Sequence, residues 1–305
     1  APLTPPLPPA DTIQLLDDGS LVQSGPNSDR LYLMKPGRAD NDALAAELVE
    51  TAREEGRTTL FAKVPELRGL PFVDVGYVEE ARVPAFYHGQ HDAIFFAYYL
   101  DDARAAEADA PRLDAILDTA VQEPVDPLPA PLEARFAIRP CVPADAEAMS
   151  RLYRKVFASY PFPIHDPAYL AAPMAEHVAY YAVEADDRIV ALSSAEMDLA
   201  DANAEMTDFA THPDWRGRGF ARRLLARMER DMKARGIKTA YTIARAASPG
   251  MNITFGRAGY AFSGRLKNNT QIAGDLESMN VWHKPLWRER PRARPRRGWA
   301  PTPGR

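Results

Sequence analysis

One short segment in the second half of the chain holds the residues whose types and spacing suggest chemistry. A β-rich run at 204–211 contains Glu205 and Asp208, a turn with two glycines and two arginines follows, and an apolar helical period begins at Phe220. Glycine lets the backbone approach a ligand closely, and the first N–H groups of a helix carry positive potential. This order of strand, turn and helix predicts a pyrophosphate-binding turn formed by Arg216, Gly217, Arg218, Gly219, Phe220 and Ala221.

The elements that must position this turn alternate between β-rich runs and helical periods. Apolar residues recur at helical spacing from Phe220 to Met232, and Gly236 follows where it would end the helix. Such alternation predicts a mixed α/β sheet with helices on its faces. The expected strands are 136–139, 177–183, 188–194, 205–211, 238–245, 260–266 and 277–283, and the expected helices are 144–157, 220–235 and 251–258.

Proline and charge divide the chain. The segment 122–135 has four prolines between 124 and 131 and is expected to be a semi-rigid linker. It separates an N-terminal lobe, 11–121, from a second domain, 136–286, that holds the glycine turn. The proline-rich start, 1–10, and the arginine-rich end, 287–305, lack the apolar residues of a core and are expected to be disordered.

The N-terminal lobe carries a faint copy of the later segment. Residues 56–62 parallel 236–242, Gly76 parallels Gly259, and a helical period at 44–52 precedes the first match. The lobe is therefore interpreted as a degenerate relative of the second domain. The alignment places Asp40 opposite the glycine turn, where negative charge would repel a pyrophosphate, so a single such site per chain is expected.

Composition excludes several classes of function. The 305 residues carry a formal net charge of −5 and are 46% hydrophobic, which is typical of a soluble globular protein and gives no general attraction to nucleic acid or to an anionic membrane. Cys141 is the single cysteine, and the loose spacing of His88, His91 and Asp92 does not favour a metal site, so no metal is expected. No apolar run is long enough to span a bilayer and no leader is recognisable, so a cytoplasmic location is expected.

The segment 136–286 resembles the GCN5-related N-acetyltransferase superfamily. The resemblance rests on Arg216, Gly219 and Ala221 in an R-x-x-G-x-A pattern and on the run 255–260 (FGRAGY). It implies that superfamily's fold, preceded here by a partial copy, with acetyl-CoA as co-substrate between the splayed strands 205–211 and 238–245. It also implies coenzyme contacts outside the turn, at Phe209, Ala210, Thr211, Ser248, Asn252 and Phe255.

A narrower resemblance, to the β-lysine N-acetyltransferases, covers nearly the whole chain except its ends. It implies acetylation of the terminal amine of β-lysine, a small-molecule substrate, to make an osmolyte. The alternatives are transfer to another diamine, a polyamine or an amino acid, or a non-catalytic acyl-CoA-binding protein. The runs that carry the resemblance are 27–35, 86–100, 160–164 (YPFPI), 203–211 (NAEMTDFAT), 240–245 (AYTIAR), 248–252 (SPGMN) and 277–282 (ESMNVW).

Acyl transfer to an amine requires a base, because an alkyl ammonium with a pKa near about 10.4 must lose a proton before it attacks. Residues of a strand alternate faces, so only one of Glu205 and Asp208 is expected to face the acceptor unless a bulge intervenes. Glu205 is favoured as the base. Asp208 is the alternative base or an anchor for an ammonium, and a surface role for either is the third interpretation.

Phe255 departs from the superfamily, whose pattern has a tyrosine there that protonates the leaving thiolate. Phenylalanine has no proton to give. Either the thiolate leaves and is protonated by water, or Tyr241 or Ser248 supplies the proton.

A β-lysine pocket requires an arginine for the carboxylate and acidic side chains for the second ammonium. A surface salt bridge would also explain each candidate taken alone. The loop 160–166 is expected to close over the acceptor or to form a rigid packed turn. The candidate acceptor contacts are Arg245, Arg265 and Asn269 for the carboxylate, Glu196, Asp208 and Glu277 for the ammonium, and Tyr160 and Phe162 in the loop.

Overall fold

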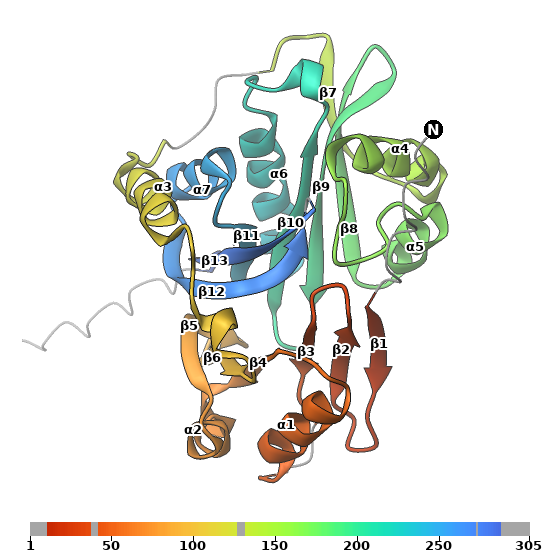
Figure 1. Ribbon diagram of the computed structural model, residues 1–305. Coiled ribbons are helices and arrows are strands. Elements are labelled where there is room, and N and C mark those ends of the chain that lie inside the picture. The colour runs from red at the N-terminus through yellow and green to blue at the C-terminus, as the bar shows by residue number, and fades with distance from the viewer. Residues whose placement is uncertain (1–10, 38–41, 127–131, 273, 288–305) are drawn as a thin grey trace, which may run out of the picture.

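A computed structural model describes residues 11–37, 42–126, 132–272 and 274–287. In these ranges the strands form a single 13-stranded mixed sheet in the order β1-β2-β3-β4-β6-β5-β12-β13-β11-β10-β9-β8-β7 (Figure 1). The expected tails, 1–10 and 287–305, lie outside the described residues except for Trp287, as does Asp40. Within the described residues no helix is both long and apolar enough to cross a membrane.

The C-terminal part of the sheet carries helices on both faces. Along β8, Tyr181 and Val183 pack in the same cluster as α6, whereas Tyr180 and Ala182 pack with α4. This is the two-residue alternation of a strand buried on both sides. The elements are β7 (Phe136–Pro140), α4 (Ala146–Val156), α5 (Pro167–Ala171), β8 (Val178–Ala185), β9 (Arg188–Asp198), β10 (Asn203–Thr211), α6 (Phe220–Ala234), β11 (Thr239–Arg245), α7 (Pro249–Arg257), β12 (Ala261–Ile272) and β13 (Asp275–Pro285).

The predicted mixed α/β sheet and its elements in this part are confirmed within a few residues, except for β9 and β12. The expected helix 220–235 corresponds to α6, whose apolar residues at helical spacing are buried, and Gly236 follows with φ +85°. The expected strand 260–266 is too short, because β12 continues to Ile272. The polar run 267–270 stays in the strand because the N-terminal lobe supplies its hydrogen-bond partners.

The N-terminal lobe has the same succession of elements. Its strands lie in the order β1-β2-β3-β4-β6-β5, which corresponds one for one to β8-β9-β10-β11-β13-β12. Thr59 is in the first residue pair between the parallel strands β3 and β4, and Thr239 is in the first pair between β10 and β11. Each follows a glycine, Gly56 or Gly236, by three residues. The elements are β1 (Thr12–Leu15), β2 (Leu21–Gly25), β3 (Arg30–Lys35), α1 (Leu44–Glu54), β4 (Thr59–Pro65), α2 (Leu70–Val75), β5 (Val78–Tyr87), β6 (His91–Tyr99) and α3 (Ala110–Gln122).

The two halves differ where their central parallel strands meet. β10 and β11 pair only from Asn203↔Thr239 to Glu205↔Tyr241 and then diverge. β3 and β4 remain paired from Arg30↔Thr59 to Leu33↔Ala62, one pair further. The opening between parallel strands therefore begins earlier in the C-terminal half.

The halves join along β5 and β12. Gly264, with φ +143°, lies opposite Ala81, and a Cβ on it would lie 2.1 Å from the Glu80 carbonyl oxygen, so the close approach requires glycine. The buried Arg104 donates to the Ser28 and Asn268 carbonyls at 3.2 and 2.7 Å, which ties the two lobes together.

The chain reaches the C-terminal half before the expected linker. α3 lies beside α7 in Figure 1, and a Cβ on Gly256 would lie 2.2 Å from the Ala120 carbonyl oxygen. Beyond α3, the Asp126 carboxylate forms an ion pair with the Arg222 guanidinium at 2.7 Å. The first residues of the predicted linker 122–135 are therefore docked on the second domain, and residues 127–131 lie outside the described ranges.

Candidate active site

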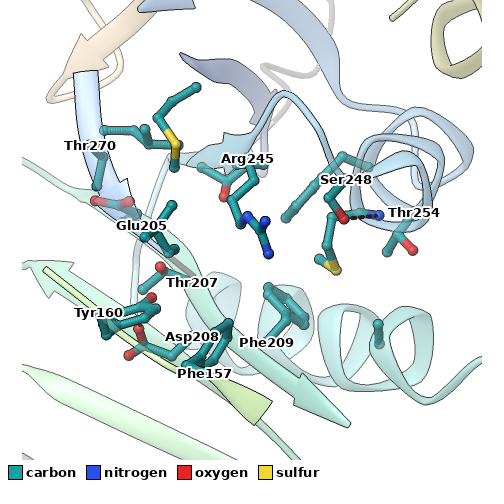
Figure 2. A pocket seen from close by; sticks show the side chains of 18 of the residues that line it. Phe157, Tyr160, Glu205, Thr207, Asp208, Phe209, Arg245, Ser248, Thr254 and Thr270 are labelled. Carbon is teal, nitrogen blue, oxygen red and sulfur yellow. Dashed lines mark hydrogen bonds between the residues drawn. The ribbon is translucent and has the colours of Figure 1, made fainter. Parts of the chain in front are cut away.

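One cavity of about 660 Å³ brings most of the predicted site residues together. Its walls come from β10, β11, the start of α6 and α7 in the C-terminal half, and from β3, β4 and β12 beside the lobe junction. Figure 2 shows Glu205, Asp208, Phe209 and Arg245 projecting into it from β10 and β11. The divergence of these two strands beyond Glu205 opens the sheet at this place.

The glycine turn forms one end of the cavity. Gly217 and Gly219 have φ +77° and +70°, a left-handed conformation that a side chain would strain. Gly219 is the N-cap of the 15-residue α6 and offers no side chain to its first turn, so the first N–H groups of the helix are open to a ligand. Residues 216–221 all line the cavity, as the sequence predicts.

A β-bulge brings both acidic residues of β10 to the cavity. The register between β10 and β9 shifts between Thr207 and Ala210, and Asp208 has φ +53°. The exception stated for a bulge therefore applies, because the bulge resets the alternation and both Glu205 and Asp208 line the cavity.

Asp208 is buried and held by two hydroxyl groups. Tyr160 donates to its Oδ1 at 2.5 Å and Ser194 donates to its Oδ2 at 2.6 Å. Burial raises the pKa of Asp208, and the two hydrogen bonds oppose this rise. Tyr160 reaches Asp208 from the loop after α4, so this loop lies against the bulge.

Two more carboxyl groups share this end of the cavity. Burial raises the pKa of Glu205, an effect that Lys63 opposes and the charge of Asp208 reinforces. Burial also raises the pKa of Glu196, and the charges of Asp208 and Glu205 add to the rise. Three acidic groups in one desolvated place favour binding of a cation and make at least one of them a strong proton acceptor.

The position of the superfamily's proton donor and the two candidate replacements, Tyr241 and Ser248, differ in their contacts. Phe255 is fully buried edge-to-face with Phe209 and Tyr260, at centroid distances of 5.7 and 5.1 Å. Burial raises the pKa of Tyr241 well above its ordinary value, so its proton is hard to remove. Ser248 is the N-cap of α7 and accepts from the Met251 N–H at 3.4 Å, which leaves its hydroxyl proton free to be donated.

Four predicted site residues do not line the cavity. The Ala210 side chain packs in the apolar cluster beneath α4. The Asn252 side-chain amide donates hydrogen bonds to the carbonyls of Arg245, at the end of β11, and of Ser248, just before α7. Glu277 accepts two hydrogen bonds from Arg245, at 2.6 and 2.9 Å, and so holds a residue that does line it. Arg265 pairs with Glu107 and Asp114 in a separate pocket. The other predicted site residues line the cavity, among them Tyr160, Phe162, Glu196, Asn269, Thr211, Ser248 and Phe255.

Sequence reasoning missed the contribution of the N-terminal lobe. Arg30 and Tyr32 on β3, and Phe61 and Lys63 on β4, line the same cavity. A signal was present, because Lys63 interrupts an otherwise apolar strand and Arg30 begins another. A charged residue inside a buried strand requires a partner or a function.

Comparison with known proteins agrees with this geometry. The sequence profile of the acetyltransferase (GNAT) family matches residues 146–254. A β-lysine N(6)-acetyltransferase of Methanococcus maripaludis is 36% identical over 265 residues, which cover 87% of this chain and 96% of that protein. The chain belongs to the β-lysine N-acetyltransferase family, within the GNAT superfamily. Another β-lysine N(6)-acetyltransferase, of Methanosarcina mazei, is 43% identical over 50% of this chain and 56% of its own length. The N-acetyltransferase YodP of Bacillus subtilis is 33% identical over 79% of this chain and 86% of its own length.

Membership of this family makes the chain an acyltransferase that uses acetyl-CoA as co-substrate and transfers acetyl to an amino group. The residues present fit that co-substrate. The glycine turn at the start of α6 offers N–H groups for a pyrophosphate, and the divergent strands leave a strand-like edge for the pantetheine arm. Among the described residues no group of three or more His, Cys, Asp or Glu is placed to hold a metal.

The acidic cluster predicts a pH-dependent cost to stability. Glu196→Gln is expected to raise the free energy of unfolding at about pH 8, because the folded state raises the pKa of Glu196 above its ordinary value of 4.5 and its ionisation therefore opposes folding. The gain should shrink as the pH falls and vanish below about pH 4.5, where Glu196 is protonated in both states. Urea unfolding at several pH values measures it.

The exposed Glu54 of α1 provides the control. Glu54→Gln should change stability by less than about 0.5 kcal/mol at any of these pH values. A Glu196→Gln variant that is no more stable than the parent at high pH would contradict the electrostatic description of the cluster.

Proposed function

We propose that this enzyme transfers the acetyl group of acetyl-CoA to the terminal amine of β-lysine. The observation that carries the proposal is the position of the acidic cluster, Glu196, Glu205 and Asp208, at the place where the opening between β10 and β11 begins. An acceptor with two ammonium groups has its charges matched there. The similarity to β-lysine N(6)-acetyltransferases over 96% of one such protein supports the same acceptor.

In this proposal the amine attacks the thioester directly. The pyrophosphate binds the N–H groups at the start of α6, beside Arg216 and Arg218, and the pantetheine arm lies in the opening between β10 and β11, against Phe209 and Thr211. The acetyl carbonyl then lies near the bulge at Asp208. The nitrogen forms a bond to the carbonyl carbon, the carbon–sulfur bond breaks, and coenzyme A departs as a thiolate.

Glu205 is proposed to accept the proton of the attacking ammonium. Its raised pKa makes it a better base than an exposed carboxylate, even though the Tyr241 hydroxyl and the Ile243 N–H hydrogen-bond to it. Both oxygens of Asp208 already accept hydroxyl hydrogen bonds, so Asp208 is proposed to orient the ammonium. The thiolate is protonated by Ser248 or by water, because Phe255 has no proton to give.

The product explains an osmolyte role. Acetylation removes the charge of the terminal ammonium, which leaves one carboxylate and one ammonium and hence no net charge. Such a zwitterion can accumulate without a counterion. We place the reaction in the cytoplasm, where the single cysteine, Cys141, stays a thiol.

A panel of acceptors tests the proposed function. Thiol release from acetyl-CoA is measured with β-lysine, lysine, ornithine, spermidine and buffer alone. The highest kcat/KM is expected for β-lysine, with acetylation at its terminal nitrogen identified by mass spectrometry. A higher value for spermidine would replace the proposed acceptor with a polyamine, and release equal to that in buffer alone would indicate a non-catalytic protein.

The pH profile tests the assignment of the base. Glu205→Gln is expected to lower kcat about 100-fold or more and to remove the acidic limb that Glu205 sets. A limb near the amine's own pKa of about 10.4 should remain, because the amine must then lose its proton to water. Asp208→Asn is the matched variant. Asp208→Asn should raise the KM for the acceptor and leave the acidic limb of the pH profile unchanged. The reverse outcome, with the limb lost in Asp208→Asn and kept in Glu205→Gln, would make Asp208 the base.

A further inference from the structure

We propose that Arg30 and Lys63, both from the N-terminal lobe, bind the carboxylate of the acceptor and make this enzyme selective for amino acids over plain diamines. The inference deepens the proposed function, since it concerns the other end of the same acceptor. It assigns a role to a lobe that the transfer chemistry itself does not require.

Arg30 is a buried cation beside the cavity without an anionic partner. Its side chain is 4% exposed, and its Nη1 donates to the Asn269 carbonyl at 3.0 Å, to the Thr270 hydroxyl at 3.0 Å and to the Asn269 side-chain oxygen. All of these acceptors are neutral, and its Nε is buried with no hydrogen-bond partner among the described residues. Within the described part of the chain no carboxylate lies within 4.0 Å of it.

The surroundings of Arg30 hold the guanidinium in place without neutralising it. It lies over the rings of Tyr32 and Phe61, at 5.1 and 5.7 Å from their centroids. Burial lowers the pKa of Arg30 to about 10, so the group is still charged at neutral pH. A buried charge is costly unless it is paired, and a carboxylate in the cavity would pair this one.

Lys63 adds a second cation on the neighbouring strand. Its Nζ lies 3.3 Å from the Tyr241 hydroxyl and 5.6 Å from the centroids of Phe86 and Tyr241. In the described ranges no carboxylate lies within ion-pair distance of it. Arg30 and Lys63 therefore present two cations, on neighbouring strands but four residues apart in register, to the cavity that also contains the three acids.

The repeat in the fold explains how this subsite arose beside the coenzyme site. In the equivalent registers of the two halves, Tyr32 and Phe61 occupy the places of Glu205 and Tyr241. The N-terminal lobe thus has an aromatic pair where the C-terminal half has its base, and this pair supports Arg30. The lobe lacks the acid needed for transfer and instead supplies the positive charge that the acidic cluster does not.

The division of charge fixes the direction in which an amino acid lies. Its carboxylate faces β3 and β4, and its ammonium groups face Glu196, Glu205 and Asp208. A diamine of the same length without a carboxylate would leave Arg30 unpaired and Lys63 with only the nearby charges of Glu205 and Glu196, and it would bind more weakly.

Calorimetric binding to the protein saturated with coenzyme A tests the proposal independently of turnover. The probes are two pairs that differ only by a carboxylate, β-lysine with pentane-1,4-diamine and lysine with pentane-1,5-diamine. The parent protein is expected to bind the amino acid of at least one pair about 10- to 100-fold more tightly than its diamine. Arg30→Met and Lys63→Met should each remove most of this preference and leave the affinity for coenzyme A unchanged.

Two further variants separate recognition from folding. Arg30→Lys keeps the charge and should retain part of the preference, which a purely structural role would not explain. Lys238→Met removes a half-buried lysine that bonds the His88 carbonyl outside the cavity, and it should leave the preference intact. Equal affinity of the parent protein for both members of each pair, or equal weakening of both members in Arg30→Met and Lys63→Met, would overturn the proposal. If lysine replaces β-lysine as the better ligand and the carboxylate preference persists, the proposed acceptor fails and this inference stands.

Discussion

The active site depends on the divergence of two parallel strands. β10 and β11 share three pairs, ending at Glu205↔Tyr241, and beyond them each strand has a free edge toward the other. An open edge inside a sheet leaves backbone groups unpaired, which is unfavourable unless a ligand or water satisfies them. The bulge at Asp208, in the pairing of β10 with β9, brings a second carboxylate to the cavity. The acidic cluster lies at the start of this opening, and the proposed positions of the coenzyme and of the acceptor both depend on it.

The N-terminal lobe extends the sheet and completes the cavity. Its parallel strands β3 and β4 stay paired for one residue pair more than β10 and β11 do. Tyr32 and Phe61 stand at the positions that correspond to Glu205 and Tyr241. Because β5 joins β12 at Gly264, β3 and β4 lie where their side chains reach the cavity of the other half. Two copies of one topology thus contribute different functions to a single site.

Much of the catalytic half could be predicted from the sequence because its signals are local. The glycine turn, the helical spacing of Phe220 to Met232 and the two acids of β10 depend on neighbours along the chain. For contacts across the lobe junction, a charged residue in a strand indicates that a partner exists, but nothing nearby in the sequence identifies that partner. Arg265 was expected in the acceptor pocket because its type is suitable, yet Glu107 and Asp114 hold it elsewhere. Arg30 was overlooked because its partners, Asn269 and Thr270, are about 240 residues away. A bulge in this strand was allowed for, but the sequence did not locate it at Asp208, since no glycine marks it.

Hydrogen–deuterium exchange with and without acetyl-CoA tests most directly whether the opening between β10 and β11 is the coenzyme site. Peptides that span 207–221 and 243–252 should exchange more slowly when acetyl-CoA is bound, because their amides bond the pantetheine arm and the pyrophosphate. Peptides from β3 and β4 should change little, since those strands are paired beyond the equivalent register. Protection centred on β3 and β4, with 207–221 unchanged, would contradict this description of the site.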